Sequence, residues 1–264
     1  MQQRGNIRVV VLNNGTHKDH EFIDKTYGHR ITLLDYGYNS GFAQGNNYCV
    51  DYALSFPDTS FIVLLNNDAE FQGETIDAMI QVYMTTHAEC IVPCIYTPSG
   101  ALESMGLTRN AFYHPYNRTS PKKPIFGPTG ACMMLTGSAV ERLTPLFRID
   151  YFAYAEDYEL GYRMRTLGIR TECGYMTKVV HKGQGSTSYL SYFSLYHTYR
   201  NLLFTYRIHL LFFQRIYAII GVIPYFIIHG IHYPKWMIPA FITGVFKKIN
   251  NTHLPSNRLN KYEP

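Results

Sequence analysis

The sequence is poor in charged residues and in tryptophan. Only 16% of its 264 residues are charged, against 46% apolar residues, and tryptophan occurs once. This composition excludes an intrinsically disordered chain and predicts one large domain, alone or with an appendage. Tyrosine and phenylalanine are nevertheless abundant, with 23 and 16 copies. Aromatic residues at this level are typical of interfaces, sugar sites and membrane surfaces.

Cysteine is also scarce. The five cysteines are an odd number without paired spacing, which argues against a disulfide framework. Cys90 and Cys94 lie in an apolar, strand-like run with no second pair nearby. We therefore expect core thiols at these positions rather than zinc ligands.

Acidic residues are almost absent from the last part of the chain. Residues 1–188 contain 16 Lys and Arg against 18 Asp and Glu, whereas residues 189–264 contain 8 basic residues and only one acid, Glu263. The sequence thus predicts a nearly neutral domain over 1–188 and a basic, aromatic, helical segment over 189–264. Its basic residues are interleaved with long apolar runs, which disfavours nucleic acid and favours the surface of an anionic bilayer.

We expect no signal peptide at the start, because the first apolar run is short and leads directly into a turn. Residues 210–231 form the one candidate membrane span, but Gln214, Arg215 and Pro224 interrupt it. We expect helices that lie in the membrane interface. A transmembrane helix and a soluble helical extension packed on the domain remain as alternatives.

Strand and helix patterns alternate along the first two thirds of the chain. Strands are predicted at 7–12, 31–36, 61–68 and 90–96, and helices at 17–28, 46–56, 74–87 and 154–168, with a strand followed by a helix over 130–143 and a glycine-rich turn over 39–47. This order predicts an α/β fold with a mostly parallel sheet, helices on both faces, and ligands at the carboxyl ends of the strands. The turn-rich stretch 97–128 is expected to be an excursion near the site.

Asn66, Asn67 and Asp68 follow an apolar strand. A carboxylate at such a place can face a crevice and hold a hard cation through oxygen. The alternative is an Asx turn or a helix cap, which favours the same residue types.

Glu156 and Asp157 open a predicted helix in which Glu159 and Arg163 are spaced for an ion pair. An acid in the first turn can cap the helix, or it can project into the crevice and take a proton from a hydroxyl.

His181 follows another strand, directly before a glycine-rich turn that contains Ser186. Lone histidines are usually structural, but this position also suits a metal ligand. The turn itself is a candidate phosphate loop, although no Walker or dinucleotide fingerprint is present.

In this order, the segments resemble the family-2 glycosyltransferases with the GT-A fold, in particular a bacterial rhamnosyltransferase-like branch. The resemblance covers roughly residues 7–205 and is carried by NNGT (13–16), NSGFAQGNN (39–47), LLNND (64–68), GACMML (130–135), FAYAEDYELGYR (152–163), HKGQGS (181–186) and YHTYRN (196–201). The family normally begins one strand and one helix earlier, so we expect these two elements to be lacking here.

The resemblance implies a GT-A fold for nucleotide-diphospho-sugar transfer, and it implies roles for single residues. Asp68, with His181 and Asn66, would hold Mg²⁺ or Mn²⁺. Asp157 would be the general base of an inverting displacement, and Glu156 would position the acceptor. The residues that would line the nucleotide pocket are Asn14, Asn39, Gly41, Ala43, Asn46 and Asn67.

The implied activity is transfer of a sugar from a nucleotide-diphosphate donor to a lipid-linked (polyprenyl diphosphate) saccharide in surface polysaccharide synthesis, such as O-antigen of lipopolysaccharide or capsule. For this branch the first donor to consider is dTDP-rhamnose, and galactose, glucose and N-acetylated sugars remain open. The expected location is peripheral, on the cytoplasmic face of the inner membrane, with no nucleic acid partner.

Two alternatives remain. One is a truncated, inactive transferase relic that binds a membrane or a partner without turnover; it is motivated by the lacking first strand. The other is a soluble nucleotide-binding enzyme such as a sugar nucleotidyltransferase, which predicts a glycine-rich phosphate loop with Lys or Arg near the N-terminus. The sequence has no such loop there.

Overall fold

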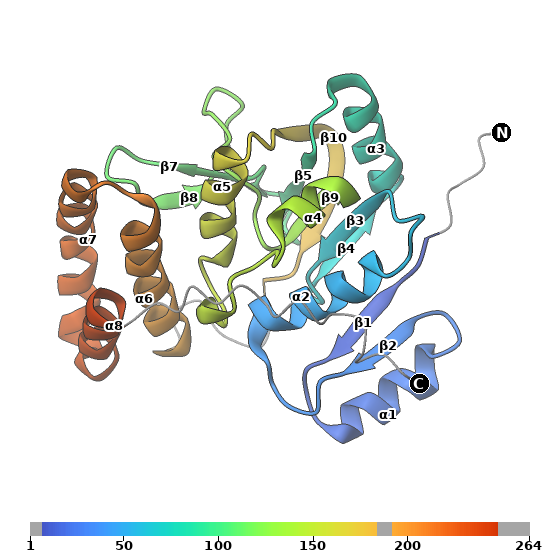
Figure 1. Ribbon diagram of the computed structural model, residues 1–264, viewed down its shortest axis with the longest axis horizontal. Helices are drawn as coiled ribbons and strands as arrows, with labels where there is room; N and C mark the ends of the chain where they lie inside the picture. Colours follow the sequence, from blue (N-terminus) through green and yellow to red (C-terminus); the bar gives the residue numbers. More distant parts are fainter. Residues whose placement is uncertain (1–6, 184–191, 248–264) are drawn as a thin grey trace.

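The computed structural model describes residues 7–183 and 192–247 (Figure 1). The described strands are β1 (Val10–Asn13), β2 (Thr32–Asp35), β3 (Phe61–Leu65), β4 (Ala69–Gln72), β5 (Cys90–Tyr96), β6 (Leu102–Ser104), β7 (Leu107–Arg109), β8 (Pro115–Asn117), β9 (Cys132–Thr136) and β10 (Thr171–His181). The described helices are α1 (His17–Tyr27), α2 (Gly41–Leu54), α3 (Thr75–Thr86), α4 (Gly137–Leu143), the 3₁₀ turn η1 (Ile149–Tyr151), α5 (Glu156–Thr166), α6 (Tyr192–His209), α7 (Phe212–His232) and α8 (Pro234–Phe246).

The central sheet has six strands in the order β3-β9-β5-β10-β4, with β6 paired to β5. Of its described pairings only β5 with β10 is parallel. The prediction of an α/β fold is confirmed, but the prediction of a mostly parallel sheet is wrong. One reason is the connection from β5 to its neighbour β9, which runs through the excursion and contains no helical crossover of the kind that a parallel neighbour needs.

Helices cover both faces of this sheet, as predicted. Alternate residues of β5 show the division: Cys90, Val92 and Cys94 belong to the core under α2, α4 and α5, whereas Ile91 packs with Met79 of α3. A strand buried on both faces must be apolar throughout, which explains the continuous run at 90–96. All five cysteines are free, and Cys90 and Cys94 are buried core thiols as predicted.

β1 and β2 form a separate two-stranded parallel sheet with α1 beside it (Figure 1). In the described part of the chain no strand joins this pair to the central sheet.

α2 begins earlier than predicted, because Gly41–Asn47 is helical rather than a turn. Its first free N–H groups have partners outside the helix: Gly41 N–H donates to Asn39 Oδ1 at 3.0 Å, and Ala43 N–H donates to the Phe152 carbonyl at 3.0 Å. These contacts satisfy the donors that usually limit where a helix can start.

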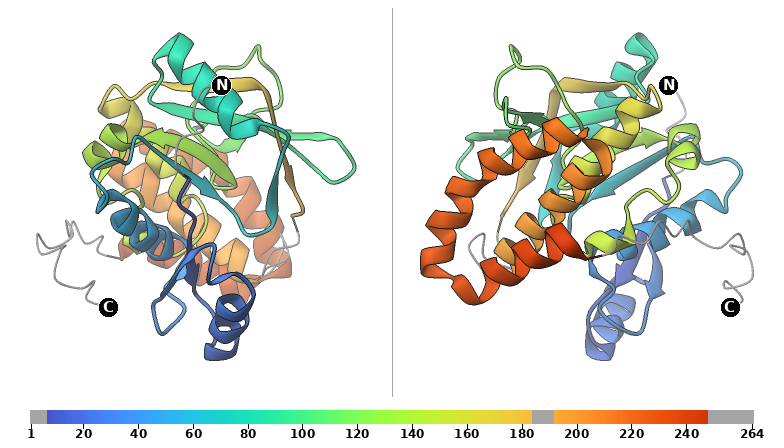
Figure 2. Two further views of the ribbon diagram at one scale, coloured as in Figure 1. Left: turned by 90° about the vertical axis from the view of Figure 1, so that its right-hand side faces the viewer. Right: turned by 60° about the vertical axis from the view of Figure 1, so that its left-hand side comes forward.

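α6, α7 and α8 form a helical group at the opposite end of the molecule from β1 and β2 (Figures 1 and 2). The group has its own buried cluster, which includes Leu202, Val222 and Ala240, while Phe204 of α6 reaches the main core. The predicted boundary at 188/189 falls outside the described residues.

The excursion 97–128 contacts three parts of the molecule, the first through β6, whose Glu103 lies against His181. Its hairpin, β7 with β8, packs on α7, where Phe112 stacks on Tyr217 with ring centroids 4.6 Å apart. Its final part runs beside α5, where a Cβ on Gly127 would lie 2.8 Å from the Gly161 Cα. Only this final part approaches the acids of α5.

Candidate active site

The end of β3 and the start of α5 meet through one short turn. Asn66 N–H donates to the Ala131 carbonyl at 3.0 Å, and the neighbouring Gly130 N–H donates to Asp157 Oδ2 at 2.8 Å. The structure therefore brings together two predicted motifs that are far apart in the sequence. A Cβ on Gly130 would lie 3.6 Å from both Asp157 Oδ2 and Glu156 Oε1. The glycine therefore leaves space beside the two carboxyl groups.

Glu156 and Asp157 occupy the first turn of α5, as predicted, and the Glu159–Arg163 ion pair is confirmed at 2.9 Å. Asp157 Oδ1 also accepts the Tyr158 N–H at 2.7 Å. Burial raises the pKa of Asp157 above its ordinary value, and the N–H donors of Gly130 and Tyr158 oppose this rise. A half-buried carboxylate with a raised pKa and a fixed orientation suits a general base.

Glu156 differs from its neighbour in burial. Its side chain is only 5% exposed, and Oε2 has no hydrogen-bond partner among the described residues. Burial, together with the charge of Asp157, raises the pKa of Glu156 to about 8. Glu156 is therefore mostly protonated at neutral pH, so its carboxyl group can donate a hydrogen bond into the site.

Asp68 and His181 lie side by side. Asp68 Oδ1 is 3.2 Å from His181 Nε2, and His181 Nδ1 is 3.0 Å from Glu103 Oε1 on β6. The antiparallel pairing of β4 with β10 produces this contact, because Lys182 N–H donates to the Asp68 carbonyl at 2.8 Å. The hydrogen bond that His181 donates to Glu103 raises the pKa of His181 above its ordinary value, against the effect of burial.

This arrangement fits a divalent cation. Asp68 Oδ1 is buried, and its contact with His181 Nε2 at 3.2 Å places an oxygen and a nitrogen ligand side by side for one ion. Glu103 holds the far nitrogen of His181, which is the usual way in which a histidine ligand is oriented. Within 7–183 and 192–247, no group of three or more His, Cys, Asp and Glu side chains surrounds a common point. An ion held by Asp68 and His181 would take its remaining ligands from water and a diphosphate.

Asn14 and Asn39 tie the end of β1 to the start of α2. Asn14 Oδ1 accepts the Ser40 N–H at 2.7 Å, and Asn14 Nδ2 donates to Asn39 Oδ1 at 3.2 Å and to the Gly41 carbonyl at 3.3 Å. Gly41 has a positive φ of 77°, and a Cβ there would lie 2.6 Å from the Phe152 carbonyl oxygen. Only glycine allows this close approach. The three predicted pocket residues thus lie together.

The other predicted pocket residues are more scattered. The side chain of Ala43 is fully buried in the main core, so only its backbone is placed to reach the pocket; its N–H donates to the Phe152 carbonyl. Asn46 Nδ2 donates to the Phe42 carbonyl at 2.9 Å within α2. Asn67 is exposed beyond the end of β3, and Asn66 is fixed there through its backbone.

Sequence reasoning missed Glu103 and assigned no role to Arg200 and Asn201 of α6. Glu103 lies in the turn-rich excursion, and no local pattern marks it as a partner of His181. Arg200 and Asn201 lie in a quoted motif, but their contacts are with the loop before α5. Ser186 of the candidate phosphate loop lies outside the described residues.

The mixed sheet thus carries a carboxylate–histidine pair at its strand ends and a second carboxylate on the Gly130 N–H, an arrangement suited to group transfer from a nucleotide sugar. The chain belongs to glycosyl transferase family 2, whose family model matches residues 1–144. The predicted family membership is confirmed.

A curated relative and two solved structures are similar to this chain. The hexosyltransferase Agl10 of low-salt glycan biosynthesis in Haloferax volcanii is 28% identical over 184 residues, which are 65% of this chain and 58% of the relative. GalNAc-T7, solved with UDP, GalNAc and Mn²⁺, superposes with a TM-score of 0.57 at 12% identity over 76% of this chain and 41% of that one. S. aureus TarS 1-349 superposes with a TM-score of 0.55 at 13% identity over 90% of this chain and 71% of that one. These likenesses confirm the GT-A fold.

Proposed function

We propose that this chain transfers a hexose-type sugar from a nucleoside-diphosphate donor to a hydroxyl of a lipid-linked saccharide in glycan synthesis. The observation that carries this proposal is the anchoring of Asp157 on Gly130, directly beside the strand end that leads to Asp68. An acid that can accept a proton and a carboxylate that can hold a cation thereby share one edge of the sheet. Family membership and the similarity to Agl10, which is named a hexosyltransferase, support the reaction class.

In the proposed reaction Asp157 takes the proton of the acceptor hydroxyl. The hydroxyl oxygen forms a bond to the anomeric carbon, the bond from that carbon to the diphosphate breaks, and the nucleoside diphosphate leaves from the opposite face. Glu156, as a neutral acid, donates a hydrogen bond that orients the acceptor. A bound Mg²⁺ or Mn²⁺ would neutralise the charge on the leaving diphosphate. Asp68 and His181 would hold that ion, with Glu103 fixing the histidine ring.

The test is calorimetric titration of the purified chain with UDP and with dTDP, each with and without Mn²⁺. We expect one nucleotide to bind only with the metal, and Asp68→Asn to weaken that binding at least about tenfold. Glu70→Gln is the control, because it removes an exposed acid two positions away on β4. If folded wild-type protein binds neither nucleotide, the inactive relic becomes the better description of this chain.

We also propose that α7 and α8 rest on an anionic membrane, where a lipid-linked acceptor is found. Of the described helices, only α7 is long and apolar enough to cross a membrane, and just 11% of its apolar window is buried. Six of its exposed apolar residues follow one stripe, about 80° wide at 3.6 residues per turn, and the exposed Phe212 and Ile228 widen the apolar face to about 160°; the six are Phe213, Ile216, Ile220, Ile223, Ile227 and Ile231. A helix of a water-soluble domain normally presents charged residues there.

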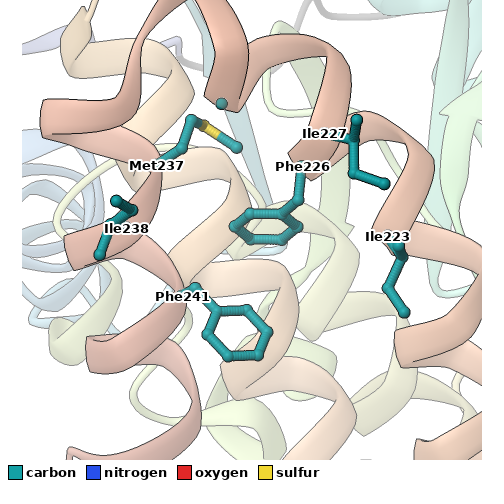
Figure 3. Close-up of a pocket in the computed structure, with 7 residues that line it drawn as sticks. Ile223, Phe226, Ile227, Met237, Ile238 and Phe241 are labelled. Carbon is teal, nitrogen blue, oxygen red and sulfur yellow. The ribbon is translucent and has the colours of Figure 1, made fainter.

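A groove between α7 and α8 extends this apolar surface (Figure 3). Its volume is about 260 Å³, and it is lined by Ile223, Phe226, Ile227, Gly230, Met237, Ile238 and Phe241. The segment 189–264 carries 8 basic residues and a single acid, Glu263. An apolar face on a segment with a basic composition suits a bilayer with anionic headgroups better than it suits water.

A further inference from the structure

The backbone that leads into α5 is strained. Phe152, Tyr154 and Ala155 all have positive φ angles, of 54°, 69° and 61°, although none of them is glycine. Residues with a Cβ avoid this region, so such a stretch persists only where its surroundings fix it. The segment 150–155, called here the lead-in loop, ends directly before Glu156 and Asp157.

Asn201 of α6 holds the lead-in loop. Its side chain is fully buried, and Nδ2 donates to three carbonyl groups of the loop. The acceptors are the carbonyls of Tyr151, Ala153 and Tyr154, at 2.8, 2.8 and 2.7 Å. An amide has two N–H groups, so one of them is shared between two acceptors. A single side chain thus hydrogen-bonds three backbone carbonyl groups of the lead-in loop and holds them close together.

Arg200 completes this contact. Its Nη2 donates to the carbonyls of Asp150 and Tyr151 at 3.0 and 3.1 Å. Its Nε donates to Asn201 Oδ1 at 2.8 Å, which fixes the orientation of the amide.

The lead-in loop also touches the nucleotide side of the site. The Phe152 carbonyl accepts the Ala43 N–H at the start of α2, and Phe152 packs against Gly41. The loop is therefore a wall shared by the predicted donor pocket and the two acids of α5. A small shift of this wall would move Asp157 away from the Gly130 N–H.

We propose that Asn201, supported by Arg200, is a positioning residue for sugar transfer. It holds the strained lead-in loop in the one conformation that sets Asp157 against Gly130. The inference rests on the proposed function for the reaction concerned, and on the hydrogen bonds alone for the mechanical role. It also gives α6 a part in the active site, although α6 lies far from α5 in the sequence.

The test compares Asn201→Ala with Asn47→Ala. Asn47 is a matched control because it is also buried and also bridges backbone, accepting the Phe147 N–H at 2.8 Å and donating to the Phe147 carbonyl at 2.6 Å, away from the lead-in loop. Hydrogen exchange of amides 151–158 and release of UDP or dTDP from UDP-glucose or dTDP-rhamnose with Mn²⁺ are measured for both. We expect a comparable loss of Tm in the two variants. Only Asn201→Ala should speed exchange in the loop at least about tenfold and lower kcat by about 10²-fold, with donor KM within threefold.

Two results would overturn the proposal: unchanged exchange of the loop in Asn201→Ala, or a fall in kcat no larger than that of Asn47→Ala. If Asn201→Ala does not fold, Arg200→Lys replaces it; this change keeps the charge but loses the Nε donor to Asn201, and it should give smaller effects of the same kind. If the wild-type chain releases no nucleotide from either donor, the proposed function fails, and the exchange measurement alone decides whether Asn201 holds the loop.

Discussion

Two neighbouring acids at the start of α5 have different surroundings. Asp157 is half-buried and accepts hydrogen bonds from two backbone N–H groups. Glu156 is buried, and its Oε2 has no hydrogen-bond partner among the described residues. Two carboxylate charges this close repel each other, which disfavours ionisation of both groups, so one of the two acids keeps its proton. Because the Gly130 and Tyr158 N–H groups both donate to Asp157, and Glu156 Oε2 has no hydrogen-bond partner among the described residues, the charge resides on Asp157. The different surroundings thus make Asp157 the base and Glu156 a neutral hydrogen-bond donor.

Replacing Asp157 by Asn removes the base and one of its two acceptor oxygens. The amide oxygen can still accept the Gly130 N–H while the Tyr158 N–H loses its side-chain acceptor, so the fold and nucleotide binding should persist. We expect turnover to fall by about 10²- to 10⁴-fold, measured as nucleotide release, with unchanged affinity in calorimetry. Asp77→Asn is the control, since Asp77 is an exposed acid in the first turn of α3. Full activity of Asp157→Asn would show that another group takes the proton.

Glu156 makes stability depend on pH. Its pKa rises from 4.5 to about 8 on folding, so the folded chain binds this proton more tightly than the unfolded chain does. The stabilising contribution is complete below about pH 4.5 and is lost as pH rises through about 8. The unfolding free energy of the wild type should therefore decrease relative to Glu156→Gln between pH 5 and pH 9, by at most ~1.4 kcal/mol per pH unit.

Urea unfolding at a series of pH values checks this expectation. Glu141→Gln, which removes an exposed acid of α4, should leave the pH dependence of the wild type unchanged. Parallel curves for the wild type and Glu156→Gln would mean that the carboxyl group is solvated in the folded chain.

At the scale of elements, the hairpin β7–β8 and helix α7 form one packed unit. Phe112 stacks on Tyr217, and His114 stacks on Tyr225 with ring centroids 4.8 Å apart and planes within 4°. Gly221 lies between these contacts, and a Cβ there would clash with the Phe112 side chain. The position needs glycine for close approach rather than for a special φ.

Gly221→Ala should therefore destabilise the chain by about 1–3 kcal/mol, because Phe112 must leave its place. Gly230→Ala is a matched control on the same helix, since a Cβ there meets no atom within 4 Å. It should stabilise the chain by about 0.5–1 kcal/mol through its better helix propensity. Thermal unfolding of the two variants measures the difference, and equal effects would show that the hairpin is not held on α7.

Elements with strong local signals were predictable from the sequence. Three of them depend only on residues adjacent in the sequence: the apolar run of β5, the capped start of α1 and the acids in the first turn of α5. β4 and the direction of β9 were not predictable, because both depend on pairing with remote strands. The site divides in the same way: Asp68, Asp157 and His181 stand at strand or helix ends, but Glu103 and Asn201 are recognisable only through partners far along the chain.

At the scale of the whole molecule, the packing of the β7–β8 hairpin on α7 limits the orientation that α7 can take relative to a membrane. The contacts at Tyr217, Gly221 and Tyr225 lie in the middle of α7, not at one end. If α7 crossed the bilayer, this middle would sit at the bilayer centre, and Arg109 and Asn110 of the hairpin would be drawn into hydrocarbon. Burial of such polar groups is costly. The packing therefore favours a helix that lies in the plane of the interface, with the hairpin on its water side.

Depth measurements distinguish the two orientations. Phe213, Ile220 and Ile231 lie on the same exposed stripe, and the outer two are about 27 Å apart along the helix. Fluorophores on Phe213→Cys, Ile220→Cys and Ile231→Cys should be quenched equally in anionic vesicles, at about 5–10 Å below the headgroups. Met176→Cys, at a residue 92% exposed on β10, should stay unquenched. A central label deeper than both ends would establish a spanning helix, whereas no quenching together with a dimer in sedimentation would assign the apolar face to a second copy of the chain.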